Sequence, residues 1–264
     1  MNNSIETGPI PPMSDSEFQA YSVNVTGDED RILPDMVHTW YFLQKERENE
    51  VDWLTGLKKR GPLNRDLGKA LASLNSAEGE PFLLVYFDVN GLKFRNDALN
   101  HEKGDELLVA TAHEVQAHIS HTDGAYRCND KGDEFVLIIP GIPESVVDER
   151  MRLLRDTLNI NITKDKFAPS LSFGYAHFDT NTPLHYRSIE VALGIVDRAM
   201  YVAKDAGKAK ITPLYEGALV DYPTLVARVR QDNSEGKDVT WAFGHEPSQA
   251  ARYYLDSNSI QPLE

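Results

Sequence analysis

The sequence predicts an α+β domain with a ferredoxin-like βαββαβ core and an antiparallel central sheet. Residues 82–87 are a short unbroken apolar run, which is typical of a strand buried on both faces. Residues 125–128 and 135–139 are two short candidate strands that flank the polar stretch 129–132, and this pattern indicates a β-hairpin. Apolar residues at helical spacing separate these strands in the order that the ferredoxin-like topology requires.

The same periodicity predicts the remaining elements of the core. Before the first strand, leucines and alanines on one face predict a helix at residues 62–74. After it, we expect helices at residues 104–120, 144–158 and 188–206, with strands at 171–176 and, as a short edge strand, at 210–213. This string gives the βαββαβ core plus one further helix and strand.

Extensions flank this core on both sides. Residues 1–33 are rich in Pro, Ser, Asn, Asp and Glu and predict an irregular arm, whereas residues 33–52 carry a helical pattern. Residues 213–264 contain short helical patterns at 222–229 and 248–255 and several aromatic residues, which indicates a packed appendage. We therefore expect an arm with a leading helix over 1–50, the core domain over 51–212 and an appendage of unknown role over 213–264.

Composition excludes several classes of protein. The chain has 264 residues and a formal net charge of -14, which argues against binding to nucleic acid or to anionic membranes through a broad basic surface. The single cysteine, Cys128, excludes an intramolecular disulfide and a multi-cysteine zinc site. No apolar run approaches the roughly 20 residues of a membrane span, and the N-terminus lacks the regions of a signal peptide. We expect a cytoplasmic protein.

The first candidate for chemistry is Asp88, at the end of the predicted strand 82–87. A carboxylate at the carboxyl end of a buried strand is well placed to hold a divalent cation, because the strand backbone fixes it and a neighbouring carbonyl can add a ligand. Viewed alone, an aspartate at this position more often just begins a turn.

The second candidate is the pair Asp133 and Glu134, which follows Gly132 at the predicted hairpin tip. Adjacent residues on an extended chain point to opposite sides, so one acid can face a metal held by Asp88 while the other bends toward it or handles a proton. A solvated hairpin tip is the equally common structural explanation.

The third candidate is the pair Lys204 and Lys208, four residues apart on the last helix of the core and its exit. Together they can hold the β- and γ-phosphates of a nucleotide. Lysines near a helix C-terminus are also favoured by the helix dipole alone, and for isolated lysines that explanation is the commoner one.

The order of these motifs resembles the GGDEF family of diguanylate cyclases. Residues 52–57 (DWLTGL) resemble the family's D-x-L-T-G-L motif, and residues 88–105 resemble D-x-[DN]-x-[FL]-K-x-x-N-D-x-x-G-H-x-x-G-D in register. Arg127 with residues 132–135 (GDEF) resembles the signature loop. Two further motifs also match the family, at residues 172–176 (SFGYA) and 197–208 (DRAMYVAKDAGK).

The resemblance implies a polymerase-palm type of fold and a set of roles. Asp88 and Asp133 would hold Mg²⁺ (or Mn²⁺), with the Val89 carbonyl and Glu134 contributing, in a two-metal arrangement. Asp133 or Glu134 would help to deprotonate the 3′-hydroxyl of GTP. The remaining roles belong to substrate binding. Guanine would be read by Asn96 and Asp105, and the triphosphate would be held by Lys204 and Lys208, with Lys93 beside it.

The resemblance also implies the reaction. Two GTP molecules would give cyclic di-GMP and two pyrophosphates, and because each domain holds one GTP, catalysis would require a homodimer. The alternatives are a catalytically silent GGDEF domain that binds GTP or a protein partner, and a cyclase that makes a different cyclic dinucleotide. Asp105 speaks against the last of these, because its carboxylate can accept from N1–H and the exocyclic amine of guanine.

Two departures from the family pattern concern the signature hairpin. Lys131 replaces its first glycine, and three residues, 128–130, separate Arg127 from Lys131 where the family has one. The backbone there must pass close to the nucleotide, which is why glycine suits it. A longer hairpin that carries Lys131 would either crowd the α-phosphate or add a cation to it.

Overall fold

The computed structural model describes residues 50–128, 132–162, 167–168, 170–208, 212–237, 241–244 and 248–263. Residues 50–264 form one compact unit. Residues 33–49 of the predicted leading helix lie outside the described residues. Its last three positions are not helical, because Val51 instead forms a β-bridge with Lys58 across a tight loop.

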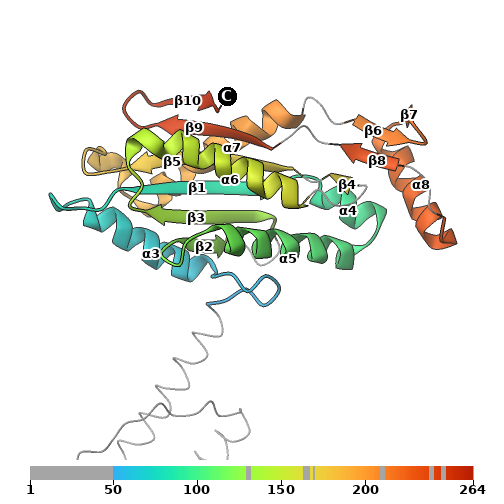
Figure 1. Cartoon of the computed structure of the whole chain (residues 1–264), viewed down its shortest axis with the longest axis horizontal. Helices are drawn as coiled ribbons and strands as arrows, with labels where there is room; N and C mark the ends of the chain where they lie inside the picture. The colour runs from blue at the N-terminus through green and yellow to red at the C-terminus, as the bar shows by residue number, and fades with distance from the viewer. Residues whose placement is uncertain are drawn as a thin grey trace, which may run out of the picture. The chain divides into compact units, whose positions relative to one another are not determined.

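A six-stranded sheet forms the centre of this unit, with the strand order β10-β9-β5-β1-β3-β2 (Figure 1). Its strands are β1 (Phe82–Val89), β2 (Gly124–Arg127), β3 (Glu134–Pro140), β5 (Leu171–Phe178), β9 (Gln249–Tyr254) and β10 (Ser259–Pro262). The four strands of the predicted core, β2, β3, β1 and β5, pair antiparallel, whereas β9 pairs parallel with β5. The predicted α+β class, the hairpin and the antiparallel central sheet are confirmed.

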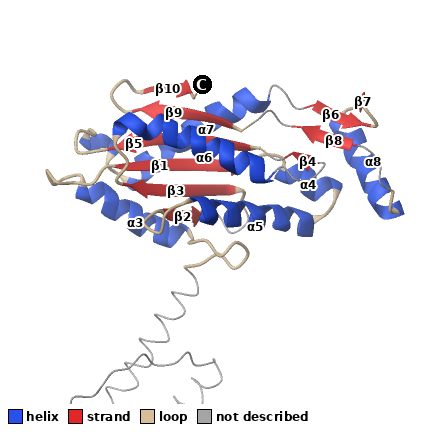
Figure 2. Ribbon diagram, viewed as in Figure 1, coloured by secondary structure: helices blue, strands red, loops and turns tan. Residues whose placement is uncertain are grey.

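Helices cover both faces of this sheet (Figure 2). Alternate residues of β1 pack into two separate hydrophobic clusters, as expected for a strand buried on both sides. One cluster joins the sheet to α4 (Leu92–Ala98), α5 (His101–His118), α6 (Val147–Ile162) and α8 (Tyr222–Glu235). The other joins it to α3 (Arg60–Ser73) and α7 (Ile189–Lys208). Two short 3₁₀ turns, at Glu144–Val146 and Leu184–Tyr186, precede α6 and α7.

A second, four-stranded sheet has the order β4-β8-β6-β7. It is made of β4 (Phe167–Ala168), β6 (Thr212–Tyr215), β7 (Ala218–Leu219) and β8 (Trp241–Gly244). The strand expected near residues 210–213 is therefore β6, but it joins this second sheet and not the edge of the main one. Strand β9 occupies the position beside β5.

The structure differs from the sequence predictions in two elements. Residues 92–98, where no element was predicted, form helix α4, and residues 248–255, expected to be a helix, contain strand β9. The alanines and tyrosines of β9 are compatible with either state, and pairing with the open edge of β5 selects the strand. Helix 222–229 is confirmed and is longer than predicted. None of the helices in the described part of the chain combines the length and the apolar character needed to cross a bilayer.

Candidate active site

The carboxylate of Asp88 is buried near the end of the central strand β1. All eight residues of this strand are buried, and Asp88 is only 4% exposed. Its neighbours across the sheet are Glu134 in β3 and Ser172 in β5. Burial, followed by the charge of Asp133, raises the pKa of Asp88 to about 6, although the hydrogen bond and charge of Lys204 act in the opposite direction. A carboxylate in this environment is stabilised by any cation placed beside it.

Helix α7 brings Lys204 to this carboxylate. The helix packs tightly on β5 at Gly174, where an added Cβ would lie 2.0 Å from the Val196 carbonyl oxygen. Lys204 follows Val196 by about two turns, so it projects from the same face of the helix toward the sheet. The Lys204 Nζ lies 2.6 Å from Asp88 Oδ1. The predicted phosphate-binding lysine and the predicted metal ligand therefore form an ion pair.

The two hairpin acids reach the same end of the sheet from β3. Asp133 is fixed to β1, because its carbonyl oxygen accepts the Val89 N–H at 3.1 Å. Glu134 lies directly opposite Asp88, and both hairpin acids are partly buried. Residues 129–131, including Lys131, lie outside the described residues. Of the predicted site residues, the structure thus brings together Asp88, Val89, Asp133, Glu134 and Lys204.

The guanidinium of Arg127 closes the base of this hairpin. Its Nε and Nη2 donate to the Gly132 carbonyl oxygen at 3.2 and 3.0 Å, and its Nη1 donates to Asp52 Oδ1 at 2.8 Å. The backbone adds a further bond, from Cys128 N–H to the Glu134 carbonyl oxygen at 3.1 Å. Both charged groups of the Asp52–Arg127 pair are buried. The positions of Asp133 and Glu134 are therefore anchored at the base of the hairpin.

Asn96 contacts Gly104, the residue before Asp105, where α4 packs on α5. The Asn96 side chain lies directly on Gly104, because a Cβ added to this glycine would sit 1.8 Å from Asn96 Oδ1. Among the described atoms, Asn96 Oδ1 is buried and has no hydrogen-bond partner. A cavity of about 550 Å³ is lined by Asp105 and Leu54 together with Glu102, Glu106, Val109, Ala110, His113 and Glu114, whereas Asn96 and Gly104 are not among its lining residues.

The other two residues predicted to bind phosphate, Lys93 and Lys208, have no contact with this cluster among the described interactions. Lys93 is exposed in the first turn of α4. Lys208 is the last residue of α7, and its side chain lies outside the described part of the structure.

The donors at the end of β1 have the chemistry that a hard divalent cation prefers. Carboxylate and carbonyl oxygens are available from Asp88, Val89, Asp133 and Glu134. The repulsion between Asp88 and Asp133 that raises the pKa of Asp88 is also the kind that a cation relieves. Within the described residues, however, no three acidic, histidine or cysteine side chains are grouped closely enough to hold one ion. The Lys204 ammonium is the cation that contacts Asp88 in this state.

Sequence reasoning missed the contribution of Tyr86. This residue is 6% exposed on β1, and its hydroxyl lies near the carboxylate of Glu134. Burial, followed by the nearby charges of Cys128 and Glu134, raises the pKa of Tyr86 well above its usual value. The available signal was a hydroxyl in an otherwise apolar strand, two residues before Asp88 and hence on the same face of the sheet.

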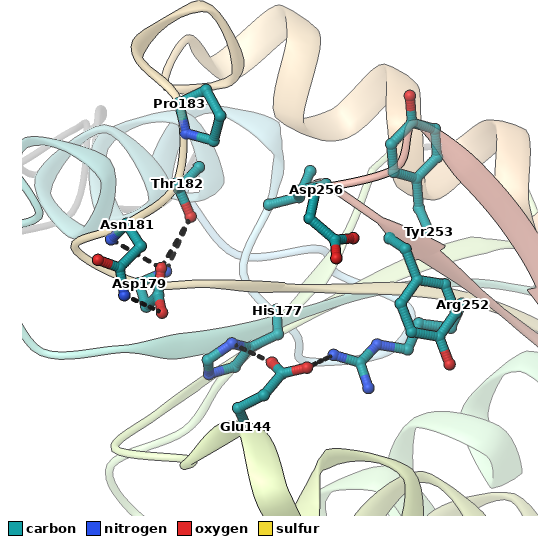
Figure 3. Close-up of a pocket in the computed structure, with 11 residues that line it drawn as sticks. Glu144, His177, Asp179, Asn181, Thr182, Pro183, Arg252, Tyr253 and Asp256 are labelled. Atoms are coloured by element: carbon teal, nitrogen blue, oxygen red, sulfur yellow. Dashed lines mark hydrogen bonds and ion pairs between the residues drawn. The ribbon is translucent and has the colours of Figure 1, made fainter.

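A second cavity, of about 330 Å³, lies at the other end of β5 (Figure 3). Its floor is an ion-pair network in which Glu144 bridges His177, at 2.6 Å, and Arg252. Arg252 also donates to Asp148 at 3.1 Å. His177 follows Ser172 by five residues, or about 17 Å along a strand, so this cavity is separate from the Asp88 cluster. The network ties β9 and the start of α6 to β5.

Comparison with known proteins identifies relatives of this arrangement. A family model described as diguanylate cyclase, GGDEF domain, matches residues 49–210. Diguanylate cyclase DgcM of Escherichia coli is 30% identical over 139 residues, which are 51% of this chain and 31% of DgcM. Diguanylate cyclase DosC of the same species is 28% identical over 165 residues, which are 61% of this chain and 34% of DosC. The chain thus spans about a third of the length of these two curated relatives.

Solved structures agree with the family model. A sensory box/GGDEF family protein from Caulobacter crescentus is 30% identical and superimposes with a TM-score of 0.52. The match covers 60% of this chain and 99% of the Caulobacter chain.

Proposed function

The chain belongs to the GGDEF domain family, and we propose that it is a diguanylate cyclase that condenses two GTP molecules into cyclic di-GMP. The observation that carries this proposal is the convergence of Asp88, Asp133, Glu134 and Lys204 at one end of the sheet. These are the residue types that positioning and activation of a triphosphate require, since such transfer depends mainly on placement and charge stabilisation.

In this proposal the chain's own residues divide the work. Asn96 and Asp105 hold guanine, and Lys204 moves from Asp88 to the terminal phosphates, where Lys208 and Lys93 add further positive charge. Asp88, the Val89 carbonyl, Asp133 and Glu134 would hold Mg²⁺ (or Mn²⁺), which supplies charge neutralisation at the triphosphate and lowers the pKa of the attacking hydroxyl. Asp133 or Glu134 accepts the proton of the 3′-hydroxyl.

The proposed reaction balances as two identical displacements. Each 3′-oxygen forms a bond to the α-phosphorus of the other GTP, and the bond from that phosphorus to the bridging oxygen of the β-phosphate breaks. Pyrophosphate leaves in each half-reaction, so two GTP molecules give cyclic di-GMP and two pyrophosphates. Because each domain would hold one nucleotide, we propose that turnover requires two copies of the chain face to face.

Incubation of the purified protein with GTP and Mg²⁺ tests the proposal, with the products separated by chromatography and identified by mass. We expect cyclic di-GMP from the wild type and a loss of at least about 100-fold in Asp133→Ala, the usual size of a general-base contribution. Asp156→Ala is the matched control, because Asp156 is an exposed acid on α6. No product at a concentration that forces dimers would contradict a cyclase, and an equal rate in Asp133→Ala would contradict the catalytic role of Asp133.

A catalytically silent GGDEF domain is the second candidate, and the ion pair between Lys204 and Asp88 favours it. In this ion pair Lys204 is already bound to a carboxylate and Asp88 is already neutralised, so neither is available to a nucleotide or a metal ion until the pair separates. Such a domain would bind GTP or a protein partner without turnover. Stabilisation by GTP and Mg²⁺ without product formation would support this second function.

Gly104→Ala tests the proposed guanine site with little effect on the fold. The added Cβ would meet the end of the Asn96 side chain at 1.8 Å, so Asn96 must turn away, while alanine favours the helix by up to about 1 kcal/mol. We expect the affinity for GTP to fall about tenfold, the loss of roughly one good hydrogen bond, with an unchanged or slightly raised melting temperature. Calorimetric titration and thermal unfolding check both parts, and unchanged GTP affinity would contradict the assignment of Asn96.

A further inference from the structure

Helix α8 lies beyond residues 49–210, the part of the chain that matches the family model, yet it packs on α4. Figure 1 shows the two helices next to each other beside the second sheet. Their contact buries Leu225, Val226 and Val229 of α8 in the same hydrophobic cluster as Phe94 of α4. A segment outside the family domain thus contacts the helix that carries Asn96.

The contact centres on Asp97, the residue that follows Asn96. Tyr222 Oη donates to Asp97 Oδ2 at 3.1 Å, and Arg230 Nε donates to the Asp97 carbonyl oxygen. The Tyr222 ring also meets the Phe94 ring edge-on, with centroids 5.8 Å apart. Burial, followed by the hydrogen bond to Asp97, raises the pKa of Tyr222 to about 12. Tyr222 and Arg230 are about two turns apart on one face of α8, so both side chains can contact Asp97 of α4.

Helix α8 is itself firmly held. Asp221 caps its N-terminus by accepting the Thr224 N–H at 2.8 Å, and Gly236 ends it in a left-handed conformation. Its Asp232 accepts the Tyr215 hydroxyl of β6 at 2.7 Å, and the Arg228 guanidinium lies over the Tyr215 ring. The helix therefore presents Tyr222 and Arg230 to α4 from a fixed support.

Helix α4 has few means of holding its own shape. It has seven residues, and its N-cap is Gly91, which has no side chain to accept a hydrogen bond from the N–H groups of the first turn. A helix this short is unstable without external contacts, because its few backbone hydrogen bonds do not offset the free-energy cost of forming the first turn. The orientation of Asn96 on Gly104 consequently depends on what packs against α4. On one side of Asn96, Arg95 Nε donates to the Lys103 carbonyl oxygen of α5 at 2.7 Å, and on the other side α8 supplies the polar contacts of Asp97.

We propose that Tyr222 and Arg230 are positioning residues for guanine recognition, acting through Asp97 to hold Asn96 in place. This inference rests on the proposed cyclase function and adds to it a role for the segment after residue 210. Tyr222 and Arg230 do not contact the nucleotide themselves, and their substitution acts on selectivity for the base.

The test measures binding of two unreactive nucleotides, 3′-deoxy-GTP and 3′-deoxy-ITP, with Mg²⁺ by calorimetry. Both lack the attacking hydroxyl, and the inosine nucleotide lacks the exocyclic amine of guanine, the donor from which the buried Asn96 Oδ1 would accept a hydrogen bond in this proposal. For Tyr222→Phe and Arg230→Ala we expect the affinity for 3′-deoxy-GTP to fall about tenfold and that for 3′-deoxy-ITP to fall less, so that discrimination shrinks. In turnover, KM for GTP should rise more than kcat falls.

Gln231→Ala is the matched control, because Gln231 is exposed on the same helix and its side chain bonds only to Glu235 among the contacts described. It should retain the wild-type discrimination, and Arg230→Lys should recover part of it, because lysine can still donate to the Asp97 carbonyl. If both affinities fall equally in Tyr222→Phe and Arg230→Ala, or if neither changes, the positioning role is wrong while the cyclase proposal stands. A wild type that binds neither nucleotide overturns both.

Discussion

Gly174→Ala should lower the melting temperature of the protein by roughly 10 °C, which corresponds to a loss of at least about 3 kcal/mol in a domain of this size. Gly174 lies in β5, where α7 crosses the sheet. An added Cβ would lie 2.0 Å from the Val196 carbonyl oxygen and 2.1 Å from the Met200 backbone nitrogen. Both atoms belong to the helix backbone, so no side-chain rotation relieves the clash and the whole helix must move.

Thermal unfolding of Gly174→Ala and Gly194→Ala, compared with the wild type, checks this expectation. Gly194 lies in α7 itself, and an added Cβ there has nothing within 4 Å. Alanine at this position should therefore leave the stability unchanged or raise it by about 0.5–1 kcal/mol. A Gly174→Ala protein that melts with the wild type would show that α7 does not pack on β5 as described.

The same substitution has a consequence for the candidate site. Lys204 reaches Asp88 because α7 lies close to the sheet, and a helix displaced at Val196 and Met200 carries Lys204 away with it. Any Gly174→Ala protein that still folds should therefore bind GTP less well than Gly194→Ala. Glycine is a poor strand former, yet Gly174 lies in the middle of β5. Its role is to let α7 approach the sheet, which places Lys204, some 30 residues later, beside Asp88.

The core could be predicted from the sequence because its local patterns and its tertiary environment agree. The apolar run that forms β1 has no polar face, so only a strand buried on both sides accommodates it. The region around β9 could not be predicted in this way. Its sequence is compatible with a helix, and its strand conformation comes from pairing with β5, some 77 residues earlier in the chain. Helix α4 was missed because seven residues after a turn give too short a period to detect.

The candidate site shows the same division. Motif order was enough to predict that Asp88, Asp133, Glu134 and Lys204 come together, and the structure brings these four to one end of the sheet. The contacts that hold them were not predictable, because they join distant segments. The Tyr86 hydroxyl reaches Glu134 only through the register of β1 and β3. Likewise, Tyr222 reaches Asp97 across 125 residues of sequence.

Asp52→Ala should destabilise the protein by about 3–5 kcal/mol at neutral pH, because it leaves the buried guanidinium of Arg127 without its charged partner. The Asp52 carboxylate accepts hydrogen bonds from Arg127 Nη1 at 2.8 Å and from Thr55 Oγ1 at 2.6 Å. Lys58→Ala is the control, because the Lys58–Asp66 pair on the surface contributes about 1 kcal/mol at most. Urea unfolding measures both, and similar losses in the two variants would contradict a structural role for the buried pair.

The loss in Asp52→Ala should also depend on pH. Burial alone would raise the pKa of Asp52, but the hydrogen bonds from Thr55 and Arg127 outweigh it and hold the pKa below the ordinary value of 3.8. The unfolded chain then binds a proton at a higher pH than the folded one, so the contribution of Asp52 to stability is complete well above pH 3.8. It disappears as the pH falls through the lower, folded pKa. Urea unfolding between pH 7 and pH 3 should therefore show a constant advantage of the wild type over Asp52→Ala down to about pH 5, and a narrowing one below pH 4. An advantage that widens in acid would mean that Arg127 does not stabilise the ionised carboxylate, and that some other contact anchors the hairpin.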